Sequence, residues 1–278
     1  MRHRSFAALA LAAVASLGLA ACGGSGSTSS DASGSSSDVV TLTVGATPSP
    51  HAKILNYVND NLAADAGINI KVVEYTDYVQ PNTALNDGEL DANFYQTVPY
   101  LENAEKQAGY DFEAGAGIHL EPLGVFSQKH KSLDELPNGG TIGIISDTSN
   151  QERALRLLAT QGLVSIPEGE GDVNVNTVTK LKDFSFNEVE GPQLVRSLED
   201  FDFAVINGNF AQEGGLSLSG DALVVESPVD NPAVNVLVWK AGSDKAAAIA
   251  KLEELLHSDQ VKQYIESTWS DGSVIPAF

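Results

Sequence analysis

Residues 141–160 read TIGIISDTSNQERALRLLAT, and this stretch decides the fold class that we expect. Residues 141–145 are a short run of mostly apolar, β-branched side chains, which predicts a buried strand. Residues 150–160 carry Leu155 and Leu158 on one face, which predicts a helix. A strand that leads through a polar loop into a helix is the repeating unit of α/β sheets with parallel strands.

The same alternation continues on both sides of this stretch and divides into two series. Further strands are expected at 39–44, 68–72, 184–189 and 203–206, and further helices at 50–66, 81–85, 99–109, 192–198, 244–256 and 259–269. Two long extended segments, about 118–127 and 223–239, join the two series. We therefore expect an α/β protein with two lobes, two crossover strands and a ligand cleft between the lobes. The expected first lobe is 39–127 plus 232–278, and the expected second lobe is 128–231.

The N-terminus has the pattern of a lipoprotein signal peptide. A basic start is followed by an apolar run at 6–21, which is shorter than the ~20 residues of a membrane-spanning helix. The run ends Leu19-Ala20-Ala21-Cys22, which looks like a bacterial lipobox, and a tract rich in Ser and Gly follows. We expect residues 1–21 to be the signal peptide, Cys22 to be lipidated, and residues 22–38 to form a flexible tether. An ordinary signal peptide followed by a buried Cys is the alternative.

Charge and cysteine content exclude several classes of protein. The 278 residues contain 16 Lys+Arg and 37 Asp+Glu, for a net charge of −21, which argues against nucleic-acid binding and against docking on anionic lipid. Removal of residues 1–21 takes away two Arg and no acid, so the mature chain carries −23. The single Cys makes an intramolecular disulfide or a Cys-based zinc site impossible. Attachment at the outer face of the cytoplasmic membrane therefore depends on the lipid alone, with two or more acyl chains.

Enzyme and cofactor motifs are missing from the sequence. It contains no G-x-S-x-G, G-x-x-x-x-G-K or G-x-G-x-x-G pattern. The histidines after the signal peptide lie far apart in the sequence, without the spacing of metal ligands: His51, His119, His130 and His257. We therefore expect no catalysis, no cofactor and no metal.

Polar and aromatic residues instead gather in loops at the ends of the expected strands. These loops are 77–82, 93–100, 147–153 and 207–209. The start of the helix near Asn150 offers backbone N–H groups beside Arg153, which suits a carboxylate or another anion. An ion pair of Arg153 with Glu152 or another neighbour is an equally good interpretation. The aromatic residues also fit core packing, and 207–209 also fits a simple turn.

These loops resemble those of the methionine-binding lipoproteins of ABC importers, the MetQ/NlpA-like family, over about 42–278. The resemblance is carried by the order and spacing of segments 44–46, 50–51, 77–82, 95–101, 119–124, 131–137, 147–153, 192–194, 204–209, 231–232 and 235. It implies a two-lobed periplasmic-binding-protein fold that closes on a free amino acid. It also implies an ABC permease and ATPase complex as partner, and a protein that acts as a monomer.

The resemblance assigns roles to individual residues. Arg153 would bind the ligand carboxylate, and Asn207 and Asn235 would offer side-chain oxygens to the ammonium group. Three tyrosines would line the pocket for the ligand side chain, where aromatic faces suit a thioether: Tyr78, Tyr95 and Tyr100.

Two positions depart from the family pattern. The family usually has His where this chain has Thr97, and an aromatic residue where it has Ala233. Thr97 is the seventh residue that we expect to bind the ligand. L-methionine or a close analogue is the expected ligand, and these departures keep open another amino acid, D-methionine or a Met-containing dipeptide. A surface-anchored hydrolase or interaction protein is the remaining alternative, because a fold does not fix a function.

Overall fold

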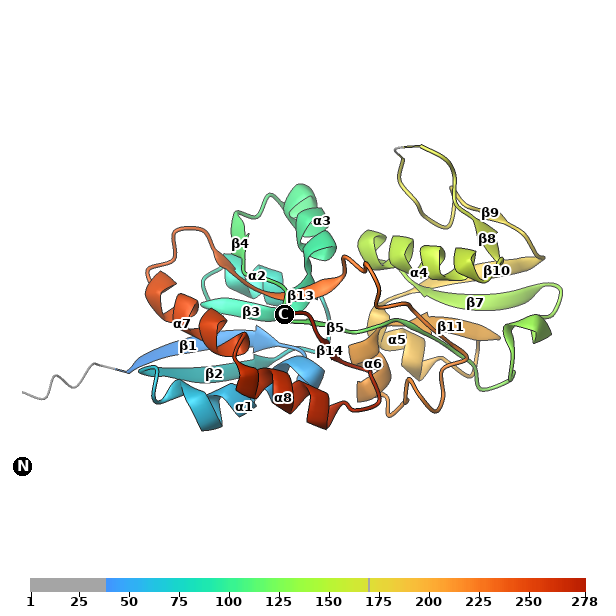
Figure 1. Ribbon diagram of the computed structural model, residues 1–278. Coiled ribbons are helices and arrows are strands. Elements are labelled where there is room, and N and C mark those ends of the chain that lie inside the picture. The colour runs from blue at the N-terminus through green and yellow to red at the C-terminus, as the bar shows by residue number, and fades with distance from the viewer. Residues whose placement is uncertain (1–38, 170) are drawn as a thin grey trace, which may run out of the picture. The chain divides into compact units, whose positions relative to one another are not determined.

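Two β-sheets form the framework of the folded chain, one for each series of strands and helices (Figure 1). The structure, a computed structural model, describes residues 39–169 and 171–278. The expected signal peptide at 1–21, the lipidation at Cys22 and the tether at 22–38 lie outside the described residues. Residues 37–278 form one unit, and the α/β architecture predicted from the sequence is confirmed.

The first sheet has the strand order β14-β5-β13-β3-β1-β2, with β4 also paired to β13. Its strands are β1 (Val40–Ala46), β2 (Ile68–Glu74), β3 (Ala92–Thr97), β4 (Phe112–Ala114), β5 (His119–Leu120), β13 (Val234–Lys240) and β14 (Ile275–Pro276). Strand β1 runs parallel to β2 and β3, whereas β13 is antiparallel to β3, β4 and β5. Strand β13 therefore returns to this sheet from the far end of the chain, as the crossover prediction requires.

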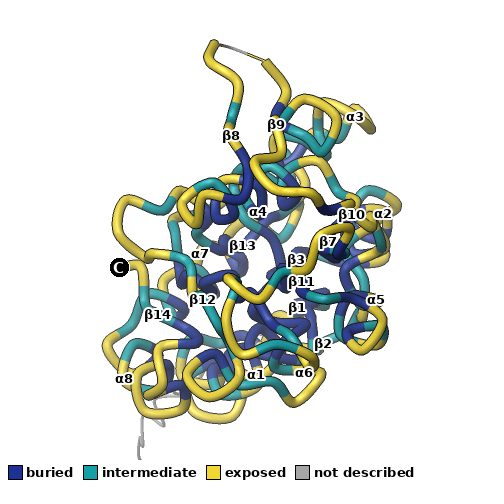
Figure 2. The backbone as a smooth tube through the Cα atoms, turned by 90° about the vertical axis from the view of Figure 1, so that its right-hand side faces the viewer, coloured by how far each residue is buried: buried dark blue, intermediate teal, exposed yellow. Residues whose placement is uncertain are grey.

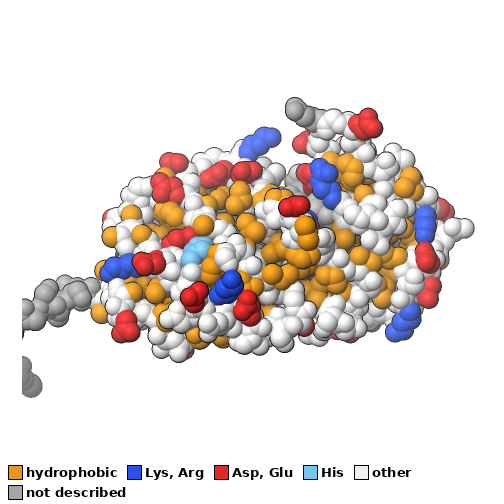
Figure 3. Space-filling model, viewed as in Figure 1, with side chains coloured by type: hydrophobic (Ala, Val, Ile, Leu, Met, Phe, Trp, Pro, Cys, Tyr) orange, Lys and Arg blue, Asp and Glu red, His pale blue; other side chains and the backbone are white. Residues whose placement is uncertain are grey.

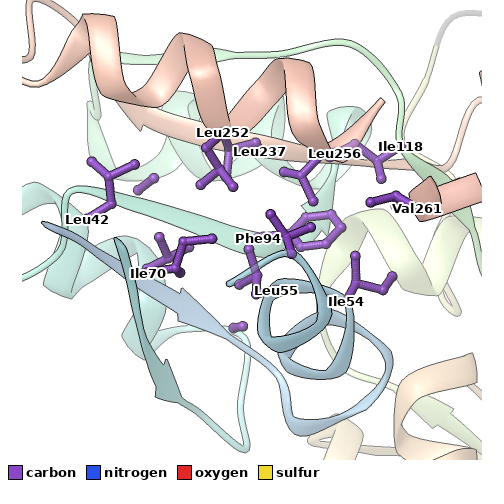
Figure 4. Close-up of a cluster of buried hydrophobic side chains, with 14 of the residues drawn as sticks. Leu42, Ile54, Leu55, Ile70, Phe94, Ile118, Leu237, Leu252, Leu256 and Val261 are labelled. Carbon is purple, nitrogen blue, oxygen red and sulfur yellow. The ribbon is translucent and has the colours of Figure 1, made fainter. Parts of the chain in front are cut away.

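Helices cover both faces of the first sheet. They are η1 (Pro48–Ala52), α1 (Lys53–Val58), η2 (Asn59–Ala63), α2 (Gln80–Asn86), α3 (Val98–Ala108), α7 (Ala246–Leu256) and α8 (Asp259–Thr268). Figure 4 shows Leu252 of α7 and Leu55 of α1 converging on Phe94 of β3 on one face. On the other face, Val236 and Val238 pack with residues of α2 and α3. Because both faces are covered at β13, its residues 236–239 are apolar at consecutive positions, whereas β1 and the edge strand β2 alternate between apolar and polar residues.

The second sheet has the order β10-β7-β11-β6-β12. Its strands are β6 (Gly124–Phe126), β7 (Gly140–Ile145), β10 (Phe184–Val189), β11 (Phe203–Ile206) and β12 (Val224–Val225), and its helices are η3 (Leu133–Glu135), α4 (Thr148–Thr160), α5 (Gly191–Arg196) and α6 (Gly208–Glu213). Phe203 and Val205 face the core under α4, and Ala204 and Ile206 face the core under α5 and α6. A short hairpin of β8 (Val164–Ser165) and β9 (Thr179–Lys180) carries an exposed loop (Figure 2).

Two connections join the sheets, at residues 121–123 and 226–233. The sequence prediction assigned residues 39–127 to the first lobe, but β6 pairs with β11 and β12 in the second sheet. The chain leaves the first sheet directly after β5, because Pro122 has no N–H group to continue the ladder. The first crossing therefore lies before Gly124 and not after residue 127.

The acidic side chains do not gather in a single patch on the face shown in Figure 3. Figure 3 shows acidic side chains spread over one face, with lysine and arginine side chains among them. Within 39–169 and 171–278, no helix is long and apolar enough to cross a membrane.

Candidate functional site

All seven residues predicted to bind a ligand line one cavity between the two sheets. The lining residues are Tyr78, Tyr95, Gln96, Thr97, Tyr100, Glu121, Asn150, Arg153, Asn207, Gly208, Asn209 and Asn235. The cavity measures about 20 Å³, which is room for about one water molecule. A free amino acid is several times larger, so the walls of this cavity must separate to admit one.

Three tyrosines of the first lobe form one wall of the cavity. The hydroxyl groups of Tyr95 and Tyr100 both donate to the backbone carbonyl of Tyr78, at 2.9 and 2.8 Å. Each pair of the three rings has its centroids 5.7–6.0 Å apart. Burial raises the pKa of Tyr78 and of Tyr95 well above that of a free phenol, so both hydroxyls stay neutral hydrogen-bond donors.

Tyr78 also joins the two lobes. Its hydroxyl donates to Oδ1 of Asn209 at 2.5 Å, and its ring stacks on Phe210 with the centroids 4.7 Å apart. Tyr78 follows strand β2 of the first sheet, whereas Asn209 and Phe210 belong to α6 of the second lobe. The contact exists only while the two lobes are together.

Thr97 starts helix α3 from the last position of β3. It has an extended backbone, and its hydroxyl accepts from the N–H of Tyr100 at 3.4 Å, as an N-cap residue does. Its short side chain thus fixes the position of Tyr100 and leaves open the volume that a larger residue would fill.

Arg153 projects from α4 and binds a carboxylate that is distant in the sequence. Its Nε donates to Oε1 of Glu226 at 2.9 Å, and its Nη2 lies 2.5 Å from Oε2. Nη2 also donates to the backbone carbonyl of Glu121 at 2.7 Å. The alternative pairing with Glu152 is wrong, because Glu152 binds Arg156 at 2.6 Å. Among the described residues, Nη1 of Arg153 has no hydrogen-bond partner, so one edge of the guanidinium group can take a second anion.

The two predicted asparagines are held by hydrogen bonds of different kinds. Asn207 donates from Nδ2 to Oδ1 of Asn150 at 2.8 Å, which leaves its own Oδ1 as an acceptor. Asn150 is in turn fixed by Asp147, the N-cap residue of α4, which accepts from the Asn150 N–H at 2.9 Å. Asn235 is held through its Oδ1, which lies 3.0 Å from Nε2 of His51.

A buried group of His51, His119 and Glu121 lies behind Asn235, and the sequence analysis missed it. Nε2 of His119 lies 2.8 Å and Nε2 of His51 lies 3.3 Å from Oε1 of Glu121, and Nδ1 of His51 lies 2.6 Å from the Thr47 hydroxyl. His51 and His119 lie far apart in the sequence, but the fold brings their rings to 4.9 Å from each other. The His119-Leu120-Glu121 alternation at the end of a strand was the available signal, because it directs both polar side chains to one side.

Burial sets the charge state of this group. Desolvation lowers the pKa of His51 to about 4 and that of His119 to about 3, so both are neutral at neutral pH. Desolvation raises the pKa of Glu121 to about 7, against the opposing effects of His51 and Arg153. The donor atoms of the three residues lie within 4.8 Å of one another, as metal ligands would. Because His51 also contacts the Thr47 hydroxyl and Oδ1 of Asn235, the group forms a hydrogen-bond network.

A second, much larger cavity adjoins the first. It measures about 820 Å³ and shares Thr97, Asn150 and Arg153 with the small cavity. Its walls are the start of α3, the outer face of α4 and the crossover 225–233, which includes Ala233. Both positions that depart from the family pattern therefore face the same space.

Comparisons with known proteins agree with this fold and site. The family model described as NlpA lipoprotein matches residues 42–278. The methionine-binding lipoprotein MetQ of Bacillus subtilis is 36% identical over 246 residues, which are 84% of this chain and 87% of that protein. A lipoprotein of Actinomyces odontolyticus has a crystal structure with TM-score 0.85 and 86% identity, over 87% of this chain and 100% of that chain. A nutrient-binding protein of Burkholderia cenocepacia, solved bound to methionine, has TM-score 0.80 and 35% identity, over 85% and 100%. The region matched by the family model contains both sheets and every residue that lines the small cavity.

Proposed function

Because the chain belongs to the NlpA lipoprotein family, we propose that it is a lipid-anchored substrate-binding protein of an ABC importer, with L-methionine as its ligand. The protein binds and releases the amino acid without catalysis and delivers it to a permease and ATPase complex. One observation carries this proposal: the seven residues predicted to bind an amino acid, drawn from both lobes, line a single cavity.

The proposed binding mode follows from the hydrogen-bonding capacity that the lining residues retain. Arg153 receives the ligand carboxylate on its Nη1 edge, while Glu226 holds the opposite edge and fixes the plane of the guanidinium group. Asn207 accepts from the ammonium group through Oδ1. The thioether lies against the ring faces of Tyr78, Tyr95 and Tyr100, to which a polarizable sulfur is attracted.

Closure of the lobes is the proposed signal to the permease. Contacts from both lobes to one ligand favour the closed state by the difference in ligand affinity between the closed and open states. The hydrogen bond between Tyr78 and Asn209 adds to the stability of the closed state. The importer then distinguishes the loaded from the empty protein by the relative position of the lobes.

The proposed location is the outer face of the cytoplasmic membrane. Cys22 carries the lipid, and residues 23–38 contain eight Ser and four Gly, which gives a tether with a reach of roughly 20–24 Å. The chain acts as a monomer, with no nucleic-acid partner.

Titration calorimetry on the full chain tests the proposal. The protein is unfolded, dialysed free of bound amino acids and refolded before L-methionine is added. We expect one site per chain, with a dissociation constant of about 1 µM or lower, which corresponds to about −8 kcal/mol or stronger. Absence of heat and of a thermal shift with L-methionine would contradict the assignment.

A Met-containing dipeptide is a second candidate ligand, and the larger cavity favours it. Thr97 and Ala233 replace larger residues and line the 820 Å³ space beside Arg153, where a second residue of a peptide can lie. A thermal-shift screen compares the twenty L-amino acids, D-methionine, Gly-Met and Met-Gly. The largest shift with L-methionine supports the first candidate, and the largest shift with a dipeptide supports the second.

A further inference from the structure

Glu121 is a buried carboxyl group at the junction of the two lobes, and the ligand-binding mode described above gives it no role. It lies on the first crossover and is 5% exposed, and it is the only acidic side chain among the described residues that line the small cavity. A carboxylate in such a place loses its hydration, so it persists only where it has strong partners.

The two oxygens of Glu121 face different partners. Oε1 is held by the first lobe, through Nε2 of His119 at 2.8 Å, Nε2 of His51 at 3.3 Å and Nδ2 of Asn235 at 3.4 Å. Oε2 faces the start of α6 in the second lobe. A Cβ atom at Gly208 would lie 3.2 Å from Oε2 and 2.9 Å from the Glu121 Cβ, so only glycine lets the α6 backbone approach this closely. Oε1 of Glu121 is thus held by the first lobe, and the carboxylate also accepts a hydrogen bond from the backbone N–H of Asn209 in the second lobe.

The residues assigned so far to bind the ligand include no anion for the ammonium group of an amino acid. The ligand brings one carboxylate and one ammonium group into a nearly dry site. Arg153 is already paired with Glu226, whereas Asn207 and Asn235 supply only dipoles. Burial of an ammonium group costs free energy unless an anion and hydrogen bonds replace its water.

We propose that Glu121 is the carboxylate that pairs with the ligand ammonium group. This inference rests on the proposed function and extends it. Oδ1 of Asn207 is a second acceptor for the ammonium group, and His119 and Asn235 fix the orientation of the carboxylate.

The direction of the pH effect follows from the charge states around Glu121. Its pKa is raised by burial to about 7, so a large fraction is protonated in the empty protein below pH 7. The ligand ammonium group favours the ionised form and lowers the pKa of the loaded protein. Ligand affinity is therefore constant from about pH 8 up to the pH at which the ligand ammonium group itself loses its proton. It falls as the pH drops below 7, by up to tenfold per unit while a whole proton is released.

The other titratable groups around Glu121 behave differently. His51 on η1 and His119 on β5 stay neutral above pH 5, and Arg153 on α4 is the cation that faces Glu121. Burial raises the pKa of Asp147 before α4 to about 6 and that of Glu213 on α6 to about 7. Neither of these two carboxyl groups lines the cavity, and Glu213 therefore provides the matched control.

The test measures affinity for two ligands across pH. Calorimetry on the full chain compares wild type, Glu121→Gln and Glu213→Gln with L-methionine and with 4-(methylsulfanyl)butanoate, which lacks the ammonium group. We expect wild type and Glu213→Gln to prefer L-methionine strongly and to lose affinity for it below pH 7. In Glu121→Gln we expect the preference to shrink by about 30-fold and the dependence on pH to flatten.

A second measurement needs no variant. Titration of wild type with L-methionine at pH 6, in buffers of different ionisation enthalpy, gives the number of protons released, which we expect to approach one. Two results would overturn the inference while the proposed function stands. One is a folded Glu121→Gln variant that keeps the wild-type preference for L-methionine and the wild-type pH profile. The other is release of no proton by wild type. Absence of amino-acid binding by wild type at every pH would remove the proposed function and the inference together.

Discussion

The hydroxyl of Tyr78 offers a direct way to weaken the closed state without touching the core of either lobe. In Tyr78→Phe the ring keeps its stacking on Phe210, but the hydrogen bond to Oδ1 of Asn209 is lost. Loss of a typical hydrogen bond costs about 0.5–1.5 kcal/mol, and a buried acceptor left without a partner costs about 1–3 kcal/mol. Asn209 is 3% exposed, and Tyr78 is the only described residue that donates to its Oδ1, so the second range applies.

The expected consequence is weaker ligand binding, because this hydrogen bond joins the two lobes and counts only in the closed state. A cost of about 1–3 kcal/mol raises the dissociation constant for L-methionine about 5- to 150-fold. Calorimetry at pH 7.5 measures the change. Tyr95→Phe is the matched control: its hydroxyl donates within the first lobe, to a carbonyl that also accepts from Tyr100, and we expect a change of less than about fivefold. Equal losses of affinity in the two variants would refute the reasoning that Tyr78 acts between the lobes.

Three further changes test other parts of the account. Gly208→Ala places a Cβ atom 2.9 Å from that of Glu121. We therefore expect at least tenfold weaker L-methionine binding by calorimetry, with little loss of thermal stability. Unchanged affinity would contradict a close approach of α6 to Glu121. Glu226→Gln weakens the ion pair with Arg153, whose two side chains are only 14% and 13% exposed. Urea denaturation should therefore show a loss of about 1–3 kcal/mol in the free energy of unfolding. An unchanged denaturation midpoint would argue against the ion pair. Leu252→Ala removes a side chain of 0% exposure from the core of the first lobe, and the expected loss is about 2–5 kcal/mol; a loss below 1 kcal/mol would contradict the packing in Figure 4.

Local pattern in the sequence was enough to predict most of the fold. The strand predicted at 141–145 and the helix predicted at 150–160 correspond to β7 and α4, and the predicted C-terminal helices correspond to α7 and α8. The strand β6 was assigned to the wrong lobe, because pairing partners depend on contacts between distant segments. Its partners begin at Phe203 and Val224, about 80 and 100 residues further along the chain.

Individual residues of the candidate site could be predicted from their chemistry, whereas the contacts between pairs of distant residues could not. The cation Arg153 and the tyrosines stand out in loops beside strand ends, and the structure brings them together. The partner of Arg153 is 73 residues away, and the contact of His51 with Asn235 spans 184 residues. Such pairs depend on the pairing of β12 in the second sheet and on the return of β13 to the first sheet, which no local spacing reveals.

The affinity of Arg153→Ala for L-methionine shows most directly whether the small cavity binds the amino acid. Arg156→Ala on the same helix is the control, because its side chain is 57% exposed and pairs with Glu152 on the surface. We expect Arg153→Ala to fold, as judged by a cooperative thermal transition, and to show no binding by calorimetry at millimolar ligand. We expect the affinity of Arg156→Ala to stay within about threefold of wild type. Near-wild-type affinity in Arg153→Ala would contradict the assignment of this cavity as the amino-acid site.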